Sequence, residues 1–170
     1  VVKDIEQFVE GNLPRIFLIG LSSIFYLGKT MRFVSEKGKP SLLREDEVSN
    51  IINNGKDAFL KELKRSDLFV FEKVFMKALL NGYAVPDPIG KTCLKAELWV
   101  RYSAMSQELA DKFKEKLLAM KSQPKVRFTS FPTAIWLLLK HTLSIDGSIL
   151  LIDIGGEVTE ATFIQDGIIV

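Results

Sequence analysis

The sequence contains almost no side chains that form disulfides or bind soft metals. Among its 170 residues there is one cysteine, Cys93, and one histidine, His141. A single cysteine cannot form an internal disulfide, and a zinc site needs several cysteine or histidine ligands. We interpret Cys93 as an ordinary strand thiol and His141 as a polar position near the end of a helix. These absences exclude a disulfide-stapled domain and favour a reducing, cytoplasmic setting.

The net charge is also small, and long apolar runs are absent from the sequence. Lysine and arginine total 23 and the acidic residues 21, so the net charge of +2 does not favour general nucleic-acid binding. The longest wholly apolar stretch, 134–139, is far shorter than the roughly 20 residues of a membrane-spanning helix. No basic-then-apolar signal opens the sequence. We therefore expect no nucleic-acid partner and no transmembrane segment.

The remaining composition is that of a folded protein. Hydrophobic residues make up 47% of the chain and charged residues 26%, which predicts one ordinary domain or two small ones. The first residue is Val1 rather than methionine, and apolar residues recur at helical spacing over 1–10. We therefore expect a helix there and a chain that is part of a longer protein.

Hydrophobic periodicity in the first half of the chain predicts strands followed by a helix. Residues 14–34 are rich in β-formers and are broken by two glycines, which predicts two or three strands. Residues 36–40 are predicted to form a polar turn. Apolar positions over 45–63 recur at helical spacing, between an acidic start and a basic finish that suit the helix dipole. The segment 53–55, Asn-Asn-Gly, is the weak point of this helix.

The second half alternates between strands and helices. Partial alternation predicts strands over 68–80 and 94–102, joined by a long proline-containing connection. The remaining predicted elements follow in chain order: a helix capped by Ser106 and reaching Met120, a strand over 126–129, a helix from Pro132 to about Leu143, a buried strand over 148–154, and a hairpin of 158–164 and 168–170 around Asp166-Gly167. The fold class is therefore mixed, α/β or α+β.

The segment 151–160, Leu-Ile-Asp-Ile-Gly-Gly-Glu-Val-Thr-Glu, carries the clearest chemical motif. A buried strand would place Asp153 at its end, and Gly155-Gly156 would make the turn. Glycine lets an anion approach the backbone, so such a turn can offer N–H groups to phosphate oxygens. Asp153 would then hold a hydrated magnesium ion beside them. A plain hairpin, in which the glycines only turn the chain, explains the same residues.

Two short sequences share the end of the phosphate-binding P-loop. They are Gly28-Lys29-Thr30 and Gly90-Lys91-Thr92. A P-loop needs a glycine five residues earlier, and Ser23 and Val85 stand at those positions. We therefore do not interpret either segment as a P-loop.

Two motifs resemble a known family. Asp153-Ile154-Gly155-Gly156 with Thr159-Glu160 resembles the second phosphate-binding hairpin of the actin-like ATPases. Residues 81–90 and 94–98 resemble the small SHS2 subdomain that is inserted in the bacterial cell-division protein FtsA. The predicted order of elements agrees with this family too. The chain thus resembles FtsA-like members of the actin-like ATPase superfamily, with the type IV pilus protein PilM as a close relative.

The resemblance implies a fragment of an actin-like lobe with an inserted strand–helix–strand–strand subdomain. It divides the chain into the end of the first lobe (1–22), the SHS2-like insert (23–122), and the return to the lobe with the second phosphate-binding hairpin (123–170). Nothing in the composition or the periodicity sets these boundaries.

The resemblance also implies ligands and partners. The longer protein would bind ATP and Mg²⁺ between lobes, self-associate, and act in cell division or envelope assembly at the inner face of the membrane. The positions that would face the nucleotide are Asp153, Gly155, Gly156, Thr159 and Glu160, with Asp153 holding Mg²⁺ through water.

Two departures from the family pattern favour an alternative. Glu157 and Val158 stand where family members show a third glycine and a threonine, and a carboxylate at Glu157 repels phosphate unless it points away or shares the metal. No glycine-rich first phosphate hairpin precedes Gly11. We therefore expect that this chain alone binds no cofactor and is inactive. The alternative is a non-enzymatic SHS2-type adaptor with a degenerate nucleotide site.

Overall fold

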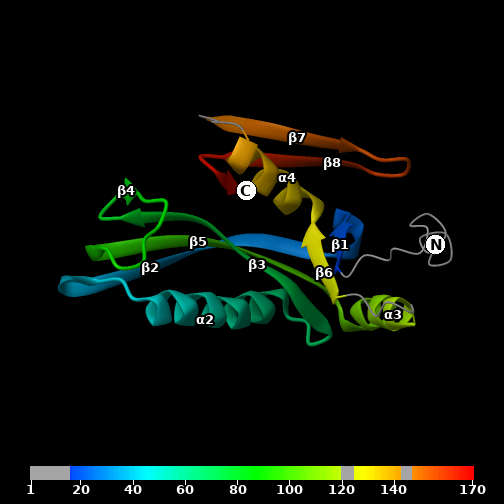
Figure 1. Ribbon diagram of the computed structural model, residues 1–170, viewed down its shortest axis with the longest axis horizontal. Coiled ribbons are helices and arrows are strands. Elements are labelled where there is room, and N and C mark those ends of the chain that lie inside the picture. The colour runs from blue at the N-terminus through cyan, green and yellow to red at the C-terminus, as the bar shows by residue number, and fades with distance from the viewer. Residues whose placement is uncertain (1–15, 120–124, 143–146) are drawn as a thin grey trace.

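The computed structural model describes residues 16–119, 125–142 and 147–170. It has a mixed α/β fold in three layers (Figure 1). A four-stranded antiparallel sheet forms the middle layer, α2 covers one of its faces, and α4 with a three-stranded sheet lies over the other. No helix in the described ranges is long and apolar enough to cross a bilayer. The predicted helix over 1–10 lies outside the described residues.

The elements and their bounds are, in chain order, β1 (Ile16–Leu21), the short 3-10 helix η1 (Ser23–Phe25), β2 (Leu27–Leu42), α2 (Glu45–Leu63), β3 (Leu68–Leu80), β4 (Tyr83–Ala84), β5 (Thr92–Ser106), α3 (Gln107–Leu118), β6 (Lys125–Ser130), α4 (Phe131–Thr142), β7 (Ser148–Ile154), β8 (Thr159–Gln165) and β9 (Ile168–Ile169). The helices predicted after residues 44, 106 and 130 are confirmed, as are the strands over 68–80 and 126–129 and the closing hairpin.

β5 is the centre of the fold because it has a partner strand on each side. The order of the large sheet is β2-β5-β3-β4, with all pairings antiparallel. Even-numbered residues of β5 face α2, where Val100 and Tyr102 pack with Phe59 and are fully buried. Burial raises the pKa of Tyr102 to about 12, and its hydroxyl donates to the carbonyl of Ile52 at 2.9 Å. This face is the main hydrophobic core.

The opposite face of the large sheet is covered by α4 and by the sheet of order β7-β8-β9. Trp136 of α4 packs with Met76 of β3, Ile164 of β8 and Ile169 of β9. Its indole N–H donates to the carbonyl of Gly167 at 2.9 Å. The turn between β8 and β9 is thereby fixed against α4.

The strand pair β1–β6 joins segments that are far apart in sequence. The two strands are parallel, with Ile16 opposite Lys125 and Leu21 opposite Ser130. Everything from β2 to α3 lies between them in the chain. α4 begins immediately after β6, so the chain passes from this pair directly into the layer above the large sheet.

An aromatic cluster fixes the end of the large sheet to β6 and α3. Tyr26 contacts Phe71 edge to face at 5.9 Å between ring centroids, and Phe71 contacts Phe128 at 6.4 Å. Phe113 of α3 meets Phe128 at 5.6 Å. Edge-to-face pairs of this kind add directional contacts to burial, so they hold Tyr26 in a defined position.

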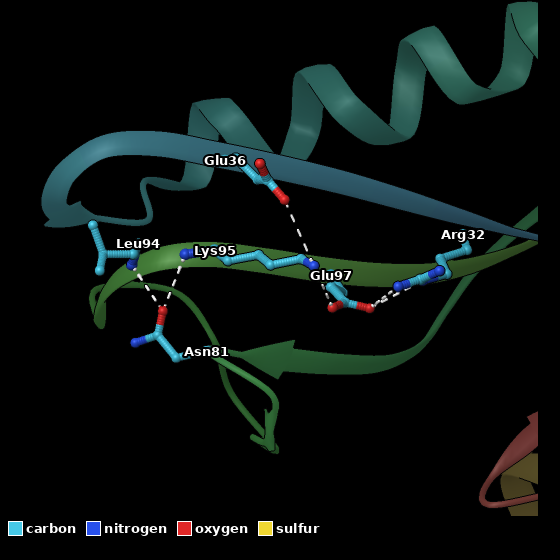
Figure 2. Close-up of polar contacts among 6 residues, drawn as sticks. All are labelled: Arg32, Glu36, Asn81, Leu94, Lys95 and Glu97. Carbon is cyan, nitrogen blue, oxygen red and sulfur yellow. Dashed lines mark hydrogen bonds and ion pairs between the residues drawn. The ribbon is translucent and has the colours of Figure 1, made fainter.

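The far end of the large sheet is held by polar contacts (Figure 2). The Glu97 carboxylate accepts from the Arg32 guanidinium and forms an ion pair with Lys95 at 3.3 Å. The Asn81 side-chain oxygen accepts from the backbone N–H groups of Leu94 and Lys95 at 2.9 and 3.0 Å. These contacts join β2, β5 and the connection after β3.

Two local predictions were wrong. Residues 36–40 do not form a turn but belong to β2, whose register with β5 shifts between Glu36 and Ser41. β2 is an edge strand, and an edge with a bulge tolerates Pro40, which lacks a backbone N–H. The strand 148–154 is not buried: its residues alternate between exposed and half-buried, and Ile154 is 79% exposed. β7 is the edge strand of a small sheet with one covered face, which explains this alternation.

Candidate functional site

A buried carboxylate organises the polar layer between the large sheet and α4. Glu72 of β3 is 6% exposed and accepts five hydrogen bonds. The donors are the hydroxyls of Ser103, Thr129, Ser130 and Thr133, and the backbone N–H of Ser130, at 2.7 to 3.0 Å. Burying an ionised carboxylate is tolerated only when its oxygens are fully hydrogen-bonded. Glu72 therefore joins β3, β5, β6 and α4.

Arg101 of β5 lies on the same face of the sheet, two residues from Ser103. The residue is only 7% exposed, and its Nε atom has no hydrogen-bond partner among the residues that the structure describes. None of the ion pairs within the described ranges involves Arg101. Gly28 makes room for the guanidinium, because a Cβ at Gly28 would lie 2.8 Å from Nη2 of Arg101.

Arg101 lines a cleft of about 550 Å³ between the first part of β2 and β8. We call it the Arg101 cleft. Other residues that line it include Tyr26, Gly28, Thr30, Thr159 and Glu160. The Thr30 hydroxyl donates to the carbonyl of Ile169 at 2.6 Å, which fixes β9 beside β2. The cleft is within the 300 to 1,000 Å³ or so that is usual for small-molecule sites.

Glu160 contributes a negative charge to the Arg101 cleft. Its Oε1 accepts from the Ser22 hydroxyl at 2.7 Å and from the backbone N–H of Ser23. Its Oε2 is buried and has no hydrogen-bond partner within the described ranges. Burial alone would raise the pKa of Glu160, but the hydrogen bonds from Ser23 and Ser22 outweigh it and lower the pKa from the ordinary 4.5. Glu160 is therefore ionised at neutral pH.

Tyr26 also lines the cleft. Its side chain is buried against Phe71, and this burial raises the pKa of Tyr26 above its ordinary 10.0. The nearby Arg101 charge and hydrogen bonds with Ser130 and Arg101 oppose the shift, and the phenol keeps its proton at neutral pH.

The predicted nucleotide-facing residues all lie on the β7–β8 hairpin. Asp153 and Glu160 are directly opposite in its ladder, and both are half-buried. Thr159 is exposed, and strand alternation places it on the other face from Glu160. The structure therefore places Asp153 and Glu160 on one face of the hairpin and Thr159 on the other, although Thr159 and Glu160 both border the Arg101 cleft.

Gly155 and Gly156 form the exposed turn of this hairpin, and they differ in what surrounds them. The Gly155 N–H donates to the carbonyl of Val158 at 2.9 Å, and a Cβ at Gly155 would lie 2.8 Å from the same oxygen. A Cβ at Gly156 would have no atom within 4 Å, and Glu157 beside it is exposed. The Gly155 amide is thus already bonded, whereas the space beside Gly156 is uncrowded.

The two sequences that resemble the end of a P-loop lie in other contexts. Gly28-Lys29-Thr30 is part of β2, and Gly90-Lys91-Thr92 leads into β5. A P-loop is followed by a helix whose N-terminus faces the phosphates.

Over the ranges that the structure describes, no cluster of three or more histidine, cysteine, aspartate or glutamate side chains could hold a metal ion.

No profile of a protein family matched the sequence, and no curated protein matched it significantly. The resemblance to FtsA-like proteins therefore rests on the two motifs and the order of elements.

Sequence reasoning missed Arg101 of the cleft and the buried hydrogen bonds of Glu72 on the same face of the sheet. Glu72, Arg101 and Ser103 occupy alternate positions of strands, which is also the pattern of a solvent-exposed face. One signal was present: small hydroxyl residues, Ser130 and Thr133, lie where β6 passes into α4. Hydroxyls at a buried helix start indicate a polar partner that they must satisfy.

Replacing Glu160 by glutamine is expected to make the variant less stable than the wild type at pH 7, by about 1 kcal/mol. The folded-state pKa of Glu160 is lowered, so ionisation stabilises the fold above the ordinary value of 4.5, and this contribution is lost as the pH falls through the lowered folded-state value. Urea unfolding of the wild type and the variant between pH 7 and pH 3 measures the difference in their free energies of unfolding. Glu157→Gln, at an exposed position of the same hairpin, is the matched control and should change stability at pH 7 by no more than about 0.5 kcal/mol. If the stability difference between the wild type and Glu160→Gln stays constant over this pH range, the stabilising role of ionised Glu160 is contradicted.

Proposed function

We propose that this chain is part of an FtsA-like protein of the actin family and serves protein assembly in cell division or in the envelope machinery. The observation that carries the proposal is the order of elements. β2, α2, β3 and β5 form a strand–helix–strand–strand unit with α2 on one face of the sheet (Figure 1). This unit and α3 lie in sequence between the paired strands β1 and β6. That arrangement supports an SHS2-type insert over 23–122 in an actin-like lobe.

In this proposal the β7–β8 hairpin faces the nucleotide of the whole protein. Its support is the position of Asp153 near the end of β7 and the open surroundings of Gly156 at the turn. Gly156 would offer its N–H to a phosphate oxygen, and Asp153 would hold Mg²⁺ through water. Magnesium would neutralise phosphate charge, while these residues bind and orient the triphosphate.

An exposed apolar face on the β7–β8 hairpin supports a role in assembly. Leu150, Ile152 and Ile154 of β7 are between 54% and 79% exposed, and Phe163 of β8 is 42% exposed. These side chains share one face by strand alternation. A contiguous exposed apolar face beside an edge strand is typical of protein–protein contact.

A non-enzymatic SHS2-type adaptor is the second candidate. It is favoured by the turn itself, because the Gly155 N–H is bonded to Val158 and is not free for a phosphate. The exposed Glu157 also places a negative charge beside the expected phosphate position. In an adaptor the hairpin would serve only as a structural support for the exposed apolar face.

Titration of the whole protein with a fluorescent ATP analogue and Mg²⁺ separates the two candidates. Nucleotide binding that Asp153→Ala abolishes, and that Asp57→Ala on the exposed side of α2 preserves, would support the ATP-binding assignment. Absence of binding by the wild type would reject it and favour the adaptor. Sedimentation with and without ATP then measures assembly, which should depend on nucleotide only in the first case.

A further inference from the structure

The buried charge of Arg101 has no counterion among the described residues. A guanidinium remains protonated in proteins, and a buried ion without a partner costs several kcal/mol. Glu72 lies on the same face of the sheet as Arg101, but its two oxygens already accept five hydrogen bonds. Glu160 lines the same cleft, yet no ion pair joins it to Arg101. An oxyanion in the cleft would supply the countercharge.

The surroundings of Arg101 suit an oxyanion. Nη2 lies against Gly28, which has no side chain to block the approach from the cleft. Tyr26 lines the cleft beside Arg101. β9 pairs only with Ile164 and Gln165 of β8, so residues 159–162 leave a backbone edge beside the cleft without a partner strand in the described part of the chain. Unpaired backbone N–H groups are further hydrogen-bond donors to an anion.

Glu160 determines what else the ligand must carry. Its Oε1 is satisfied by Ser22 and Ser23, whereas its Oε2 is buried without a donor. A purely anionic ligand would be repelled by this ionised carboxylate. A hydroxyl or ammonium group next to the oxyanion would instead be attracted by the carboxylate. The cleft therefore selects for both groups in one molecule.

We propose that the Arg101 cleft binds a small molecule that carries an oxyanion, a carboxylate or a phosphate, beside a hydroxyl or ammonium group. Arg101 pairs with the oxyanion, and Glu160 accepts from the neighbouring donor. This site borders the β7–β8 hairpin and shares Glu160 with the predicted nucleotide-facing residues, but the argument from Arg101 does not rest on the proposed function.

Isothermal titration calorimetry can test whether the ligand needs both an oxyanion and a neighbouring donor group. The four probes are acetate, glycerate, inorganic phosphate and glycerol 3-phosphate. If the cleft prefers a carboxylate, glycerate should bind more tightly than acetate. If it prefers a phosphate, glycerol 3-phosphate should bind more tightly than inorganic phosphate. The pair that binds more tightly identifies the oxyanion. Arg101→Met should weaken binding by about 10- to 100-fold, the usual contribution of a charge-assisted hydrogen bond. Arg127→Met removes one exposed charge outside the cleft and should leave binding unchanged.

The stability of Arg101→Met separates a binding role from a structural one. Removal of a buried uncompensated charge should leave the unfolding midpoint in urea unchanged or raised, whereas loss of a structural contact would lower it. Gly28→Ala provides a second variant, which keeps the charge but displaces the guanidinium, and it should also weaken binding. If neither variant folds, the test is made by NMR on the wild type. The amide chemical shifts of Gly28 must then change on addition of the most tightly binding probe, while those of Gly38 do not. Absence of saturable binding by all four probes, or an equal loss in Arg127→Met, would overturn the proposal.

Discussion

Replacing Glu72 by alanine is expected to lower the free energy of unfolding by about 3 to 5 kcal/mol. The carboxylate is the acceptor for three buried side chains, Ser103, Ser130 and Thr133, and each hydroxyl left without an acceptor costs about 1 to 3 kcal/mol. The truncation would also separate β3 from the start of α4. Urea unfolding followed by circular dichroism measures the effect.

Two further substitutions show that the loss comes from the buried network. Glu72→Gln keeps the shape but offers one carbonyl oxygen in place of two acceptors, so an intermediate cost is expected. Glu115→Ala, at an exposed position of α3, should change stability by no more than about 0.5 kcal/mol. A cost below about 1 kcal/mol for Glu72→Ala would show that the hydroxyls find other acceptors.

Alanine at Gly55 is expected to destabilise the protein by about 1 to 3 kcal/mol, although alanine favours helices more than glycine does. A Cβ at Gly55 would lie 2.3 Å from the Tyr102 hydroxyl oxygen and 2.4 Å from Cζ of Phe33. Tyr102 cannot move cheaply, because it is fully buried, donates to Ile52 and stacks on Phe59. Thermal and urea unfolding of Gly55→Ala measure the cost of this overpacking.

The neighbouring position gives the matched control for Gly55. Asn54 is exposed on the same helix, so Asn54→Ala should be neutral or stabilising by a few tenths of a kcal/mol. Tyr102→Phe removes the hydroxyl that the new Cβ would meet, and part of the loss in Gly55→Ala should be recovered in the double variant. A Gly55→Ala protein as stable as the wild type would contradict the close packing of α2 on β5.

The sequence was sufficient for elements whose signals are local. The helix over 45–63 was predicted with its observed bounds, since its acidic first turn and its apolar stripe are properties of neighbouring residues. The turn at Asp166-Gly167 was predicted for the same reason, and both residues have positive φ, 50° and 78°. The segment 53–55 was expected to weaken the helix, and the structure instead gives Gly55 a packing role.

The sequence was insufficient wherever the covering layer decides the environment of a strand. The run over 148–154 is apolar enough for a buried strand, yet β7 lies at a sheet edge and leaves Ile152 and Ile154 exposed. The predicted site residues Asp153, Gly155, Gly156, Thr159 and Glu160 all fall on one hairpin, as expected. Their faces differ, because the pleat sends successive side chains to opposite sides.

By itself, the sequence determined the periodic helices and strands, their order, and the turns that require glycine or an acidic residue. Only the tertiary structure decided that Glu72 and Arg101 are buried. An alternating polar face looks the same in the sequence whether water or another layer covers it. The covering residues here, Ser130 and Thr133, lie 58 and 61 positions from Glu72. Contacts at that separation form when layers pack together, and no local pattern encodes them.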